Sequence, residues 1–481
     1  MSAEFDAVVV GSGPNGLAAA ITLARAGCSV LVVEAHDHPG GGMRSLELTL
    51  PGFVHDVCAA IHPLALASPF FKELPLHEHG LAWVYPDAEV AHPFENGPAV
   101  LVERDLEATA QQFGVDAAAY RRLVRPYARA WHKVIHDFLG PLRIPRYPAM
   151  FVRFGVPALL PAATLARLAF QGERARAVFA GMAGHSLMPL EHAATGAFGL
   201  MLLMLSHSVG WPLARGGSQA IADALVGYLK TLGGRLTTGQ AVRSIDELPP
   251  ARLYMLSVTP RQMLRMAGER LSPAYRRQLA RYRYAPGAFK VDYALSSPIP
   301  WHDPAVARAA TVHVGGTLDE IAASERAPWN NHPGERPFVL LAQPSLFDDT
   351  RTPDGGHTAW TYCHVPNGSD VNMTARMEAQ IERFAPGFTG SVLARHTHSA
   401  AAMELYNANY IGGDINGGVQ DLRQLFTRPA VRVSPYSTPD PAIYICSAST
   451  PPGGGIHGLS GYFAALAALR RNGLHPGADA S

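Results

Sequence analysis

Short apolar runs and glycines alternate near the start of the chain. An apolar run at residues 7–10 leads into a glycine-rich segment at 11–16. Residues 17–26 then have a helical pattern of small side chains, and a second apolar run at 30–33 ends at Glu34. Short apolar runs bounded by turn residues are typical of strands buried in a parallel sheet. The pattern predicts a strand, a glycine turn, a helix and a second strand that ends at an acidic residue.

The other end of the chain has a related pattern. Residues 442–448 form an apolar run, residues 450–458 are rich in proline and glycine, and residues 459–471 have a helical pattern. The 23 residues that follow Gly458 are too few for a further crossover, strand and acidic residue. We therefore expect this segment to supply a second helix N-terminus that points at the ligand of the first glycine turn.

Between these ends the pattern changes twice. Residues 120–138 and 164–205 have helical apolar repeats, whereas residues 290–295, 338–342 and 357–365 alternate as strands do. We predict an α/β fold in which a discontinuous nucleotide-binding domain stands beside an α+β substrate domain. The predicted ranges are 1–75, 205–260 and 435–475 for the first domain, and 76–204 and 261–434 for the second.

The first glycine turn has the residues that a dinucleotide requires. Gly11 allows the tight turn, Gly13 lets the backbone approach a pyrophosphate, and Gly16 lets the helix pack close to the strand. Unpaired N–H groups at the helix start attract phosphate, while Glu34 can accept hydrogen bonds from a ribose and repels a 2′-phosphate. The pattern predicts FAD or NAD rather than NADP. The predicted contacts in this unit are Gly11, Ser12, Gly13, Pro14, Asn15, Gly16, Glu34 and Ala35.

The residues after this unit favour FAD. An NAD-binding domain would continue into a helix and a third parallel strand, whereas a glycine cluster at residues 40–42 lets the chain pass flat against the pyrophosphate and ribityl chain of a flavin. Arg44 adds a fixed charge near the phosphate or the substrate. We therefore predict FAD contacts at Gly41, Gly42, Met43 and Arg44.

Several motifs resemble those of a known family. They are GSGPNGLAAA at residues 11–20, GGGMRS at 40–45, LPGFVHDVCAAIHPL at 50–64 and SASTPPGGGIHGLSG at 447–461. Through them the chain resembles the phytoene desaturase and carotenoid isomerase-like family of FAD-dependent oxidoreductases, and within it the bacterial phytoene dehydrogenase-related branch. Further matches at residues 183–200, 210–225, 290–301 and 407–418 extend the resemblance over nearly the whole chain.

The resemblance implies FAD as cofactor and the architecture of flavin amine oxidases and phytoene desaturases, with a Rossmann-type FAD-binding domain. It places Val242 on the adenine side of the cofactor. It also places the C-terminal turn over the flavin, with contacts at Ser449, Gly455, Gly458 and Leu459. One segment departs from the family, because residues 241–260 lead almost directly from one strand to the next where relatives have a β-hairpin.

Three residues are candidates for catalysis. His457 lies in the closing turn, where the resemblance places the flavin ring, and a solvent-facing turn residue is the alternative. Tyr410 precedes a glycine-rich loop and could face the substrate. His55 follows an apolar residue and precedes an acidic one, so it is either an oriented base or a structural hydrogen-bonding group. His396 and His398 share a strand face, but no third ligand accompanies them at helical or hairpin spacing, and we predict no metal site.

These features predict an FAD-dependent oxidoreductase that desaturates a hydrophobic substrate of the polyene, terpenoid or lipid type. Hydride would pass to N5 of the flavin, and oxygen or a quinone would accept the electrons afterwards. Two alternatives stay open. One is a double-bond isomerase that depends on reduced FAD, and the other is a non-catalytic scaffold that retains FAD.

Composition narrows the class of partner. Hydrophobic residues make up 48% of the chain and charged residues 16%, which is below the roughly 25% usual in soluble proteins and indicates apolar surface in a cavity, an interface or a membrane contact. The net charge of +1 gives no electrostatic footprint for nucleic acid. The 4 cysteines show no paired spacing, which favours reduced thiols and a cytoplasmic protein.

Two apolar stretches bear on a membrane. Residues 192–214 are uncharged and long enough to span a bilayer, but their glycines and proline favour a buried helix. Residues 148–170 contain prolines and arginines and are expected to form a helical cap. The alternative for this second stretch is a peripheral contact at the inner face of the membrane, through which an oily substrate enters.

Overall fold

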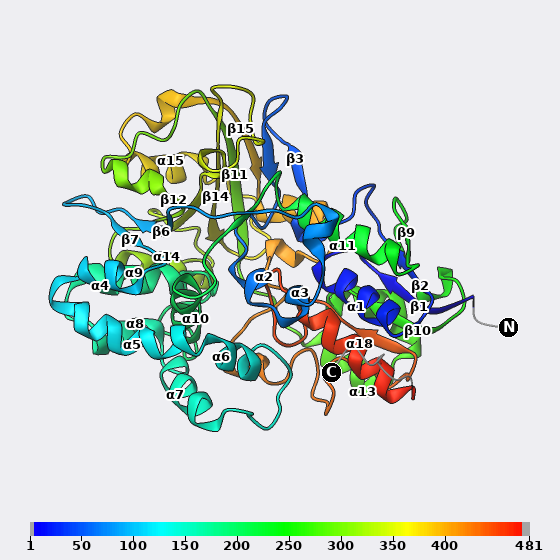
Figure 1. Ribbon diagram of the computed structural model, residues 1–481. Helices are drawn as coiled ribbons and strands as arrows, with labels where there is room; N and C mark the ends of the chain where they lie inside the picture. Colours follow the sequence, from blue (N-terminus) through cyan, green and yellow to red (C-terminus); the bar gives the residue numbers. More distant parts are fainter. Residues whose placement is uncertain (1–3, 474–481) are drawn as a thin grey trace.

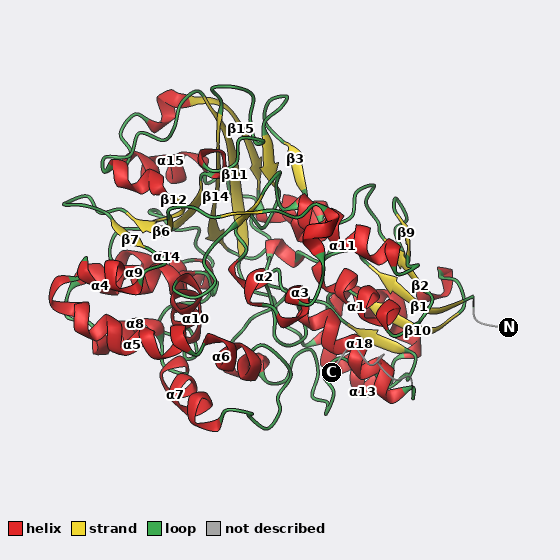
Figure 2. Cartoon of the chain, viewed as in Figure 1, coloured by secondary structure: helices red, strands yellow, loops and turns green. Residues whose placement is uncertain are grey.

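The computed structural model describes residues 4–473. Its two main sheets have five and seven strands. The smaller sheet lies at the right of Figure 1 and the larger at the upper left, and a lobe of helices lies below the larger sheet. The same division is visible in Figure 2, where most strands belong to these two sheets. The fold is mixed α/β, which confirms the predicted fold class.

The five-stranded sheet is parallel throughout, in the order β16-β10-β1-β2-β9. Its interior strands are apolar and almost fully buried, as a parallel sheet covered on both faces requires. The sheet joins segments from the start, the middle and the end of the described chain. Its strands are β1 (Phe5–Val10), β2 (Val30–Val33), β9 (Arg235–Thr237), β10 (Ala251–Leu256) and β16 (Ile443–Ile445).

Helices cover both faces of this sheet. On one face lie α1 (Pro14–Arg25), α11 (Gln219–Thr231) and α18 (Leu459–Arg471), and on the other α12 (Pro260–Ala267) and α13 (Pro273–Ala280). Helices α1 and α18 lie side by side (Figure 1). A Cβ atom at Gly461 would lie only 1.7 Å from the backbone oxygen of Asn15. This close approach brings the N-terminus of α18 next to that of α1.

The seven-stranded sheet has the order β15-β11-β14-β13-β12-β6-β7 and is antiparallel except between β12 and β6. One face packs on α15 (Thr374–Glu382) in an apolar core. The other face is turned towards α9 (Glu173–Gly184), α10 (Gly196–Ser206) and the five-stranded sheet. The strands are β6 (Ala88–His92), β7 (Val100–Val102), β11 (Gly287–Leu295), β12 (Ala309–Val314), β13 (Val339–Ala342), β14 (His357–Val365) and β15 (Val392–His398).

The helical lobe packs against the larger sheet through α9 and α14 (Leu318–Arg326). Residues 120–138, predicted as one helical region, form two helices that meet at Ala130. The predicted region 164–205 forms three. The helices of the lobe are α4 (Leu106–Gln111), α5 (Ala117–Arg129), α6 (Trp131–Phe138), α7 (Pro148–Ala158), α8 (Ala162–Ala169), α9 (Glu173–Gly184) and α10 (Gly196–Ser206).

Short elements connect these parts. Two small hairpin-like sheets pair β3 (Ser45–Glu47) with β4 (Val54–Asp56), and β5 (Trp83–Val84) with β8 (Leu213–Ala214). Residues 241–260 hold only a short 3-10 turn at Ile245–Glu247 before β10, so the described chain passes from β9 to β10 without a hairpin, as the sequence indicated. The remaining α-helices are α2 (Pro63–Ala67), α3 (Pro69–Lys72), α16 (Ala400–Tyr406) and α17 (Leu422–Leu425).

Within residues 4–473, none of the helices alone has the length and apolar composition needed to cross a bilayer. Helices α7 and α8 meet those criteria only together, and they are bent by 101° relative to each other. Helix α10, inside the uncharged stretch 192–214, is mostly buried, as expected. The domain boundaries themselves stay a prediction, and residues 1–3 and 474–475 of the predicted ranges lie outside the described residues.

Candidate functional site

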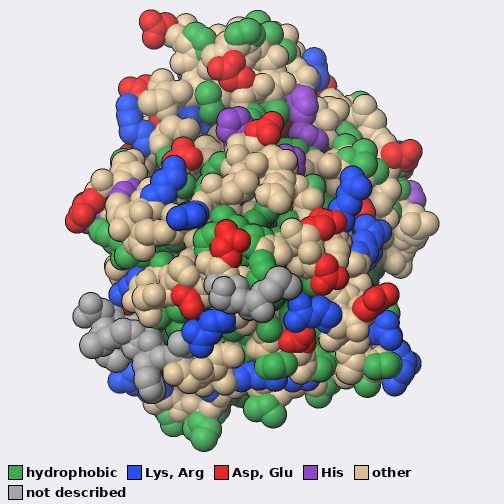
Figure 3. Space-filling view, turned by 90° about the vertical axis from the view of Figure 1, so that its right-hand side faces the viewer, with side chains coloured by type: hydrophobic (Ala, Val, Ile, Leu, Met, Phe, Trp, Pro, Cys, Tyr) green, Lys and Arg blue, Asp and Glu red, His purple; other side chains and the backbone are tan. Residues whose placement is uncertain are grey.

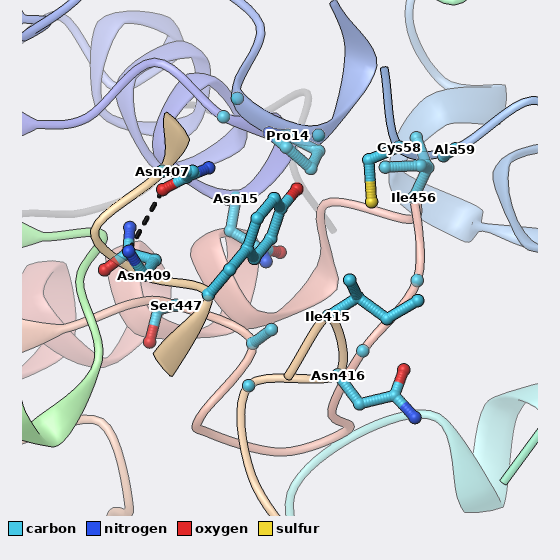
Figure 4. A pocket seen from close by; sticks show the side chains of 18 of the residues that line it. Pro14, Asn15, Cys58, Ala59, Asn407, Asn409, Ile415, Asn416, Ser447 and Ile456 are labelled. Atoms are coloured by element: carbon cyan, nitrogen blue, oxygen red, sulfur yellow. Dashed lines mark hydrogen bonds between the residues drawn. The ribbon is translucent and has the colours of Figure 1, made fainter. Parts of the chain in front are cut away.

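A cavity of about 590 Å³ runs from the two glycine turns to the seven-stranded sheet. Figure 4 shows Asn15, Asn407 and Asn409 on one side of it and Cys58 and Ile456 on another. Most predicted cofactor contacts line it: Gly11, Gly13, Pro14, Asn15, Glu34, Ala35, Gly41, Gly42, Arg44, Val242, Ser449 and Gly455. Five others lie behind its wall: Ser12, Gly16, Met43, Gly458 and Leu459.

The first turn presents bare backbone to this cavity. Gly11 has a φ of +93°, and a Cβ at Gly16 would lie 1.9 Å from the backbone oxygen of Gly11. A Cβ at Gly41 would lie 2.9 Å from Cα of Gly13, so the two glycine segments are in contact. Gly13 is the N-cap of α1. The amide groups at the start of α1 therefore face the cavity without a side chain in front of them.

Glu34 is buried at the end of β2 and ties the turn together. Its Oε2 accepts hydrogen bonds from the backbone N and the Oγ of Ser12, at 2.8 and 2.6 Å. Its Oε1 accepts from the backbone N of His36 at 3.0 Å and from Nη2 of Arg44 at 3.2 Å. The carboxylate therefore shapes the loop as well as lining the cavity.

The C-terminal turn is fixed by close contacts from another loop. A Cβ at Gly455 would lie 2.6 Å from Cδ1 of Leu64. Ser449 donates from its Oγ to the backbone oxygen of Gly417 at 2.8 Å. Gly458 is the N-cap of α18 with a φ of +68°. The turn thus supplies a second wall of the cavity, beside the first turn.

The far end of the cavity is an apolar chamber. Phe198 and Leu202 of α10, Leu340 of β13, and Trp360 and Tyr362 of β14 line it. Among the described lining residues, the only Asp, Glu, Lys or Arg side chains are those of Glu34 and Arg44, and both are at the nucleotide end. An unpaired charge is costly to bury in such surroundings. The chamber therefore suits an uncharged molecule.

A pair of histidines stands at the end of the chamber. His185 lines the cavity, and its Nε2 lies 2.9 Å from Nε2 of His313 on β12. Burial lowers the pKa of His185 to about 3 and holds the pKa of His313 well below its usual value. Both imidazoles are therefore neutral near pH 7, and the pair adds hydrogen-bonding groups without adding charge.

Tyr410 is the catalytic candidate that the structure brings to the cavity. Its hydroxyl lies 2.7 Å from where a Cβ of Gly42 would be, beside Cys58. Burial holds the pKa of Tyr410 well above its usual value and also raises the pKa of the Cys58 thiol. Near neutral pH both groups keep their protons, so Tyr410 can donate a hydrogen bond but is a poor base.

His457 does not line the cavity. Its Nδ1 accepts a hydrogen bond from the backbone N of Leu459 at 3.0 Å, and its carbonyl oxygen accepts from Oγ of Ser68 at 2.6 Å. Burial lowers the pKa of His457 to about 4. The side chain is therefore neutral and inside the turn rather than facing solvent, and its contacts orient the start of α18.

His55 also lies outside the cavity lining. Its Nε2 is 2.8 Å from Oγ1 of Thr49, and its Nδ1 is 3.7 Å from Oδ1 of Asp292. Burial lowers the pKa of His55 to about 3. The neighbouring Asp56 points elsewhere, because it accepts from Nη2 of Arg351 at 3.0 Å. The predicted His55–Asp56 pair is thus two separate contacts.

Sequence reasoning did not find several lining residues. The chamber residues named above come from strands and helices far apart in the chain, and no local motif joins them. Another group consists of Tyr406 at the end of α16 and of Asn407 and Asn409 in the loop that follows. For this group the glycine-rich stretch that follows was the available signal, and it pointed to Tyr410 alone.

Comparisons with known proteins identify the first unit. Residues 9–74 match the model of an NAD(P)-binding Rossmann-like domain. Over 97% of the chain and 94% of the relative, the chain is 27% identical to pyridine nucleotide-disulfide oxidoreductase domain-containing protein 2 of Mus musculus. It is 31% identical to hydroxyneurosporene desaturase of Cereibacter sphaeroides over 50% of each protein. It is 26% identical to phytoene dehydrogenase of Streptomyces griseus over 75% of the chain and 73% of the relative.

Solved structures with the same fold include an oxidoreductase from Methanosarcina mazei, with a TM-score of 0.65, 16% identity and coverage of 96% of this chain and 99% of that one. A putrescine oxidase variant has a TM-score of 0.62 and 16% identity, covering 98% and 99%. These identities show the fold alone. Together the comparisons confirm the predicted resemblance: the chain is a distant homologue of phytoene and neurosporene desaturases, and it is an oxidoreductase with the fold of flavin amine oxidases.

Proposed function

We propose that this oxidoreductase is an FAD-dependent dehydrogenase that takes hydride from a C–H bond of an uncharged, hydrophobic substrate. The observation that carries the proposal is the continuity of one cavity, which begins at two glycine turns and ends in an apolar chamber. The desaturases among its homologues support the same reaction class.

The residues present fit FAD. Bare backbone at Gly13 and Gly41 leaves room for a pyrophosphate, and Glu34 is placed at the end of β2 for a ribose. Nη1 of Arg44 and Oδ1 of Asn15 are buried atoms without a hydrogen-bond partner among the described residues. Buried polar groups are normally paired, so these two atoms suit polar atoms of the cofactor. When bound, FAD supplies a two-electron acceptor for hydride.

The chain itself supplies position and a dry environment. Phe198, Leu202 and Trp360 confine an apolar molecule between α10 and the seven-stranded sheet. Holding the reacting C–H bond in one orientation lowers the entropic part of the barrier, and excluding water prevents side reactions. The chamber needs no charged base, because the proton that is lost together with the hydride can pass to a neutral imidazole of the cavity lining, such as that of His62. The hydrogen-bonding groups at its end, His185 and its partner His313, instead orient a polar end of the substrate.

The chamber argues against an amine as substrate. A protonated amine would need a carboxylate to pair with its charge, and the described chamber residues include no Asp or Glu. The two alternative functions inferred from the sequence, isomerase and scaffold, would use the same cavity. An isomerase would bind the same class of substrate, and a scaffold would bind FAD but no substrate.

Anaerobic reduction of the purified protein separates these readings. Terpenoid alcohols and other apolar candidates are added to the flavin-loaded protein, and the visible absorbance of the flavin and the product mass are followed. Bleaching with a product two hydrogens lighter supports the dehydrogenase. A product with the same mass as the substrate, formed only when the flavin has been reduced beforehand, indicates the isomerase. If no candidate changes the flavin absorbance or yields a product, the scaffold is indicated.

Leu202→Glu is the matched variant, because it introduces a charge into the chamber far from the glycine turns. It should retain FAD and lose bleaching by apolar substrates. Bleaching that is equal in the variant and the wild type would mean that the substrate does not enter this chamber.

We also propose a peripheral contact with a membrane through the region of α7. Ile144, Val152 and Val156 are 92%, 60% and 63% exposed, and Arg146 and Arg153 lie within the same stretch. Apolar side chains flanked by arginines suit the surface of an anionic bilayer. Flotation with vesicles that contain anionic lipid tests this. Ile144→Glu together with Val152→Glu should abolish flotation, and equal flotation of wild type and variant would contradict the contact.

A further inference from the structure

A cluster of polar side chains lies at one edge of the seven-stranded sheet, outside the cavity. In the register of β11 and β15, Asp292 lies opposite His396 and Lys290 lies opposite His398. Residues two apart on a strand share a face, so all four side chains are on the same face. β15 is the edge strand. The cluster is therefore buried on its β11 side and reachable from its β15 side.

The two histidines converge with the carboxylate. One ligand atom each from Asp292, His396 and His398 can be chosen so that all lie within 4.8 Å of one another. The centroids of the two imidazole rings are 4.5 Å apart. Residues two apart on a strand are separated by about 6.6 Å along the chain. The rings therefore lean towards each other instead of standing parallel.

Each of these three residues also has a buried ligand atom without a hydrogen bond among the described residues. Nδ1 of His396, Nδ1 of His398 and Oδ1 of Asp292 are all buried and without a hydrogen bond. Buried donors and acceptors are rarely left unpaired. Three such atoms at one place, of the kinds that bind borderline metal ions, indicate a shared ligand rather than three separate defects.

His55 of β4 supplies a fourth candidate atom. Its Nδ1 is also buried and unpaired, and it lies 3.7 Å from Oδ1 of Asp292. In a tetrahedral zinc site, ligand atoms that are about 2.0–2.1 Å from the metal are about 3.3 Å from each other. Only Asp292, His396 and His398 have ligand atoms that all lie within 4.8 Å of one another, so His55 would have to move further than these three to reach that geometry.

The charges at the site are compatible with a dication. Lys290 donates a hydrogen bond to Oδ2 of Asp292, which leaves Oδ1 for a metal. The nearest further charges, Asp56 and Arg351, form their own ion pair at 3.0 Å. The carboxylate is thus shared between an ammonium group and the proposed ion, as metal-bound carboxylates often are with outer hydrogen-bond donors.

We propose that His396, His398 and Asp292, with His55 as a fourth ligand, bind a divalent first-row transition-metal ion such as Zn²⁺. The site is independent of the proposed function, since none of its ligands lines the cavity. Its ligands come from β4, β11 and β15, so the ion would clamp the edge strand of the sheet to the hairpin formed by β3 and β4. Figure 3 shows several histidine side chains in the upper part of the face that it presents.

Zinc titration of the flavin-loaded protein tests the proposal. The protein is purified with a histidine-free tag, treated with a chelator and titrated with ZnCl₂ by calorimetry. We expect one Zn²⁺ per chain and a rise in the midpoint of thermal unfolding. His396→Gln with His398→Gln should weaken binding at least tenfold and remove the thermal shift, while the flavin content stays that of the wild type.

The chain offers a matched control in a second His-x-His pair. His77 and His79 lie in the 3-10 turn at Leu76–His79, where His77 is exposed. Replacing both with Gln should leave zinc binding unchanged. The proposal is overturned if Zn²⁺ does not bind the wild type saturably. It is also overturned if the His77 and His79 variant loses Zn²⁺ binding while the His396 and His398 variant keeps it.

X-ray absorption of the zinc-loaded wild type gives a result that does not depend on the folding of any variant. A shell of nitrogen and oxygen ligands with imidazole scattering from at least two histidines is expected. A sulfur-containing shell would point to the cysteines and would equally overturn the assignment.

Discussion

The two main sheets differ in the polarity of their faces. Strands β1 and β10 of the five-stranded sheet are apolar on both faces and packed between helices. The seven-stranded sheet has one apolar face, packed on α15, and one face that carries Trp360, Thr311, Asp292 and several histidines. The first sheet presents bare backbone to the cavity at the carboxyl ends of β1 and β2, whereas the second presents side chains from one of its faces. A binding site made of backbone is visible in the sequence as a local motif. A site made of side chains on a sheet face depends on how distant strands pair, and no local motif shows that.

The sharpest test of backbone recognition compares two glycines of one turn. In Gly13→Val the Cβ meets only Cα of Gly41, at 3.9 Å, so the fold tolerates it while the side chain fills the space next to α1. We expect a folded protein with no bound FAD, even with FAD in excess. In Gly16→Val the Cβ would lie 1.9 Å from a backbone oxygen, and we expect failure to fold. Absorbance and circular dichroism measure both. A folded Gly13→Val protein that is yellow, and so contains FAD, would contradict the proposal that FAD binds against the bare backbone at Gly13.

The next largest effect concerns the ion pairs that connect the hairpin of β3 and β4 to the loop before β14. Arg351 is buried and donates to Asp56 of β4 at 3.0 Å and to Asp348 at 2.8 Å. Arg351→Leu leaves two carboxylates without their cation, and breaking such a pair costs about 3–5 kcal/mol. Urea unfolding of wild type and variant measures the difference in free energy.

This difference should depend on pH in a defined direction. The guanidinium of Arg351 contributes to holding the pKa of Asp56 below its usual value. A lowered folded-state pKa stabilises the protein above the unfolded-state pKa of about 3.9 and loses that effect as pH falls. The gap between wild type and Arg351→Leu should therefore narrow on acidification from pH 7. A gap that widened would show that the pair does not stabilise the fold.

Glu34→Ala should have an intermediate effect. The variant removes a carboxylate from the ribose position and also releases Ser12 and Arg44. Hydrogen bonds to charged groups contribute about 1.5–3 kcal/mol, which is about a ten- to hundredfold loss of FAD affinity. The protein should purify pale and regain its absorbance with added FAD. Stoichiometric FAD retained through gel filtration would contradict the placement of the ribose.

The smallest effect tests the side chains of the second sheet. Nε1 of Trp360 is buried and unpaired among the described residues. Trp360→Phe keeps an aromatic ring but removes this donor, which contributes about 1 kcal/mol when paired. We expect about a fivefold higher KM for an oxygen-bearing substrate and little change for a hydrocarbon, with unchanged FAD content. Equal effects on both substrates would mean that only the shape of the ring matters.

Local patterns in the sequence predicted several individual helices and strands well. The apolar run 30–33 is β2, and the helical pattern 459–471 is α18. Residues 357–365, read from alternation, are β14. In each case neighbours in sequence determine the element, because burial on one or both faces imposes a period of two or a continuous apolar run.

The same reasoning failed where contacts depend on pairing between distant strands. Nothing local indicates that Asp292 lies opposite His396, so a third candidate ligand was missed. The chamber residue Trp360 belongs to a strand that was predicted, but its direction towards the cavity follows from how the sheet packs. The break at Ala130 between α5 and α6 had a local signal that was not used, because Pro126 lies in the last turns of α5.

The contact between α1 and α18 bears on how the protein is made. The two helices are separated by more than four hundred residues, yet their N-termini enclose one cavity. At a synthesis rate of about 5–20 residues per second, roughly 20–90 s pass between the appearance of the first helix and that of the second. During translation, α1 must therefore wait with the surface around Asn15 uncovered and only half of the binding site in place. A dinucleotide could therefore be enclosed completely only after α18 has been synthesised.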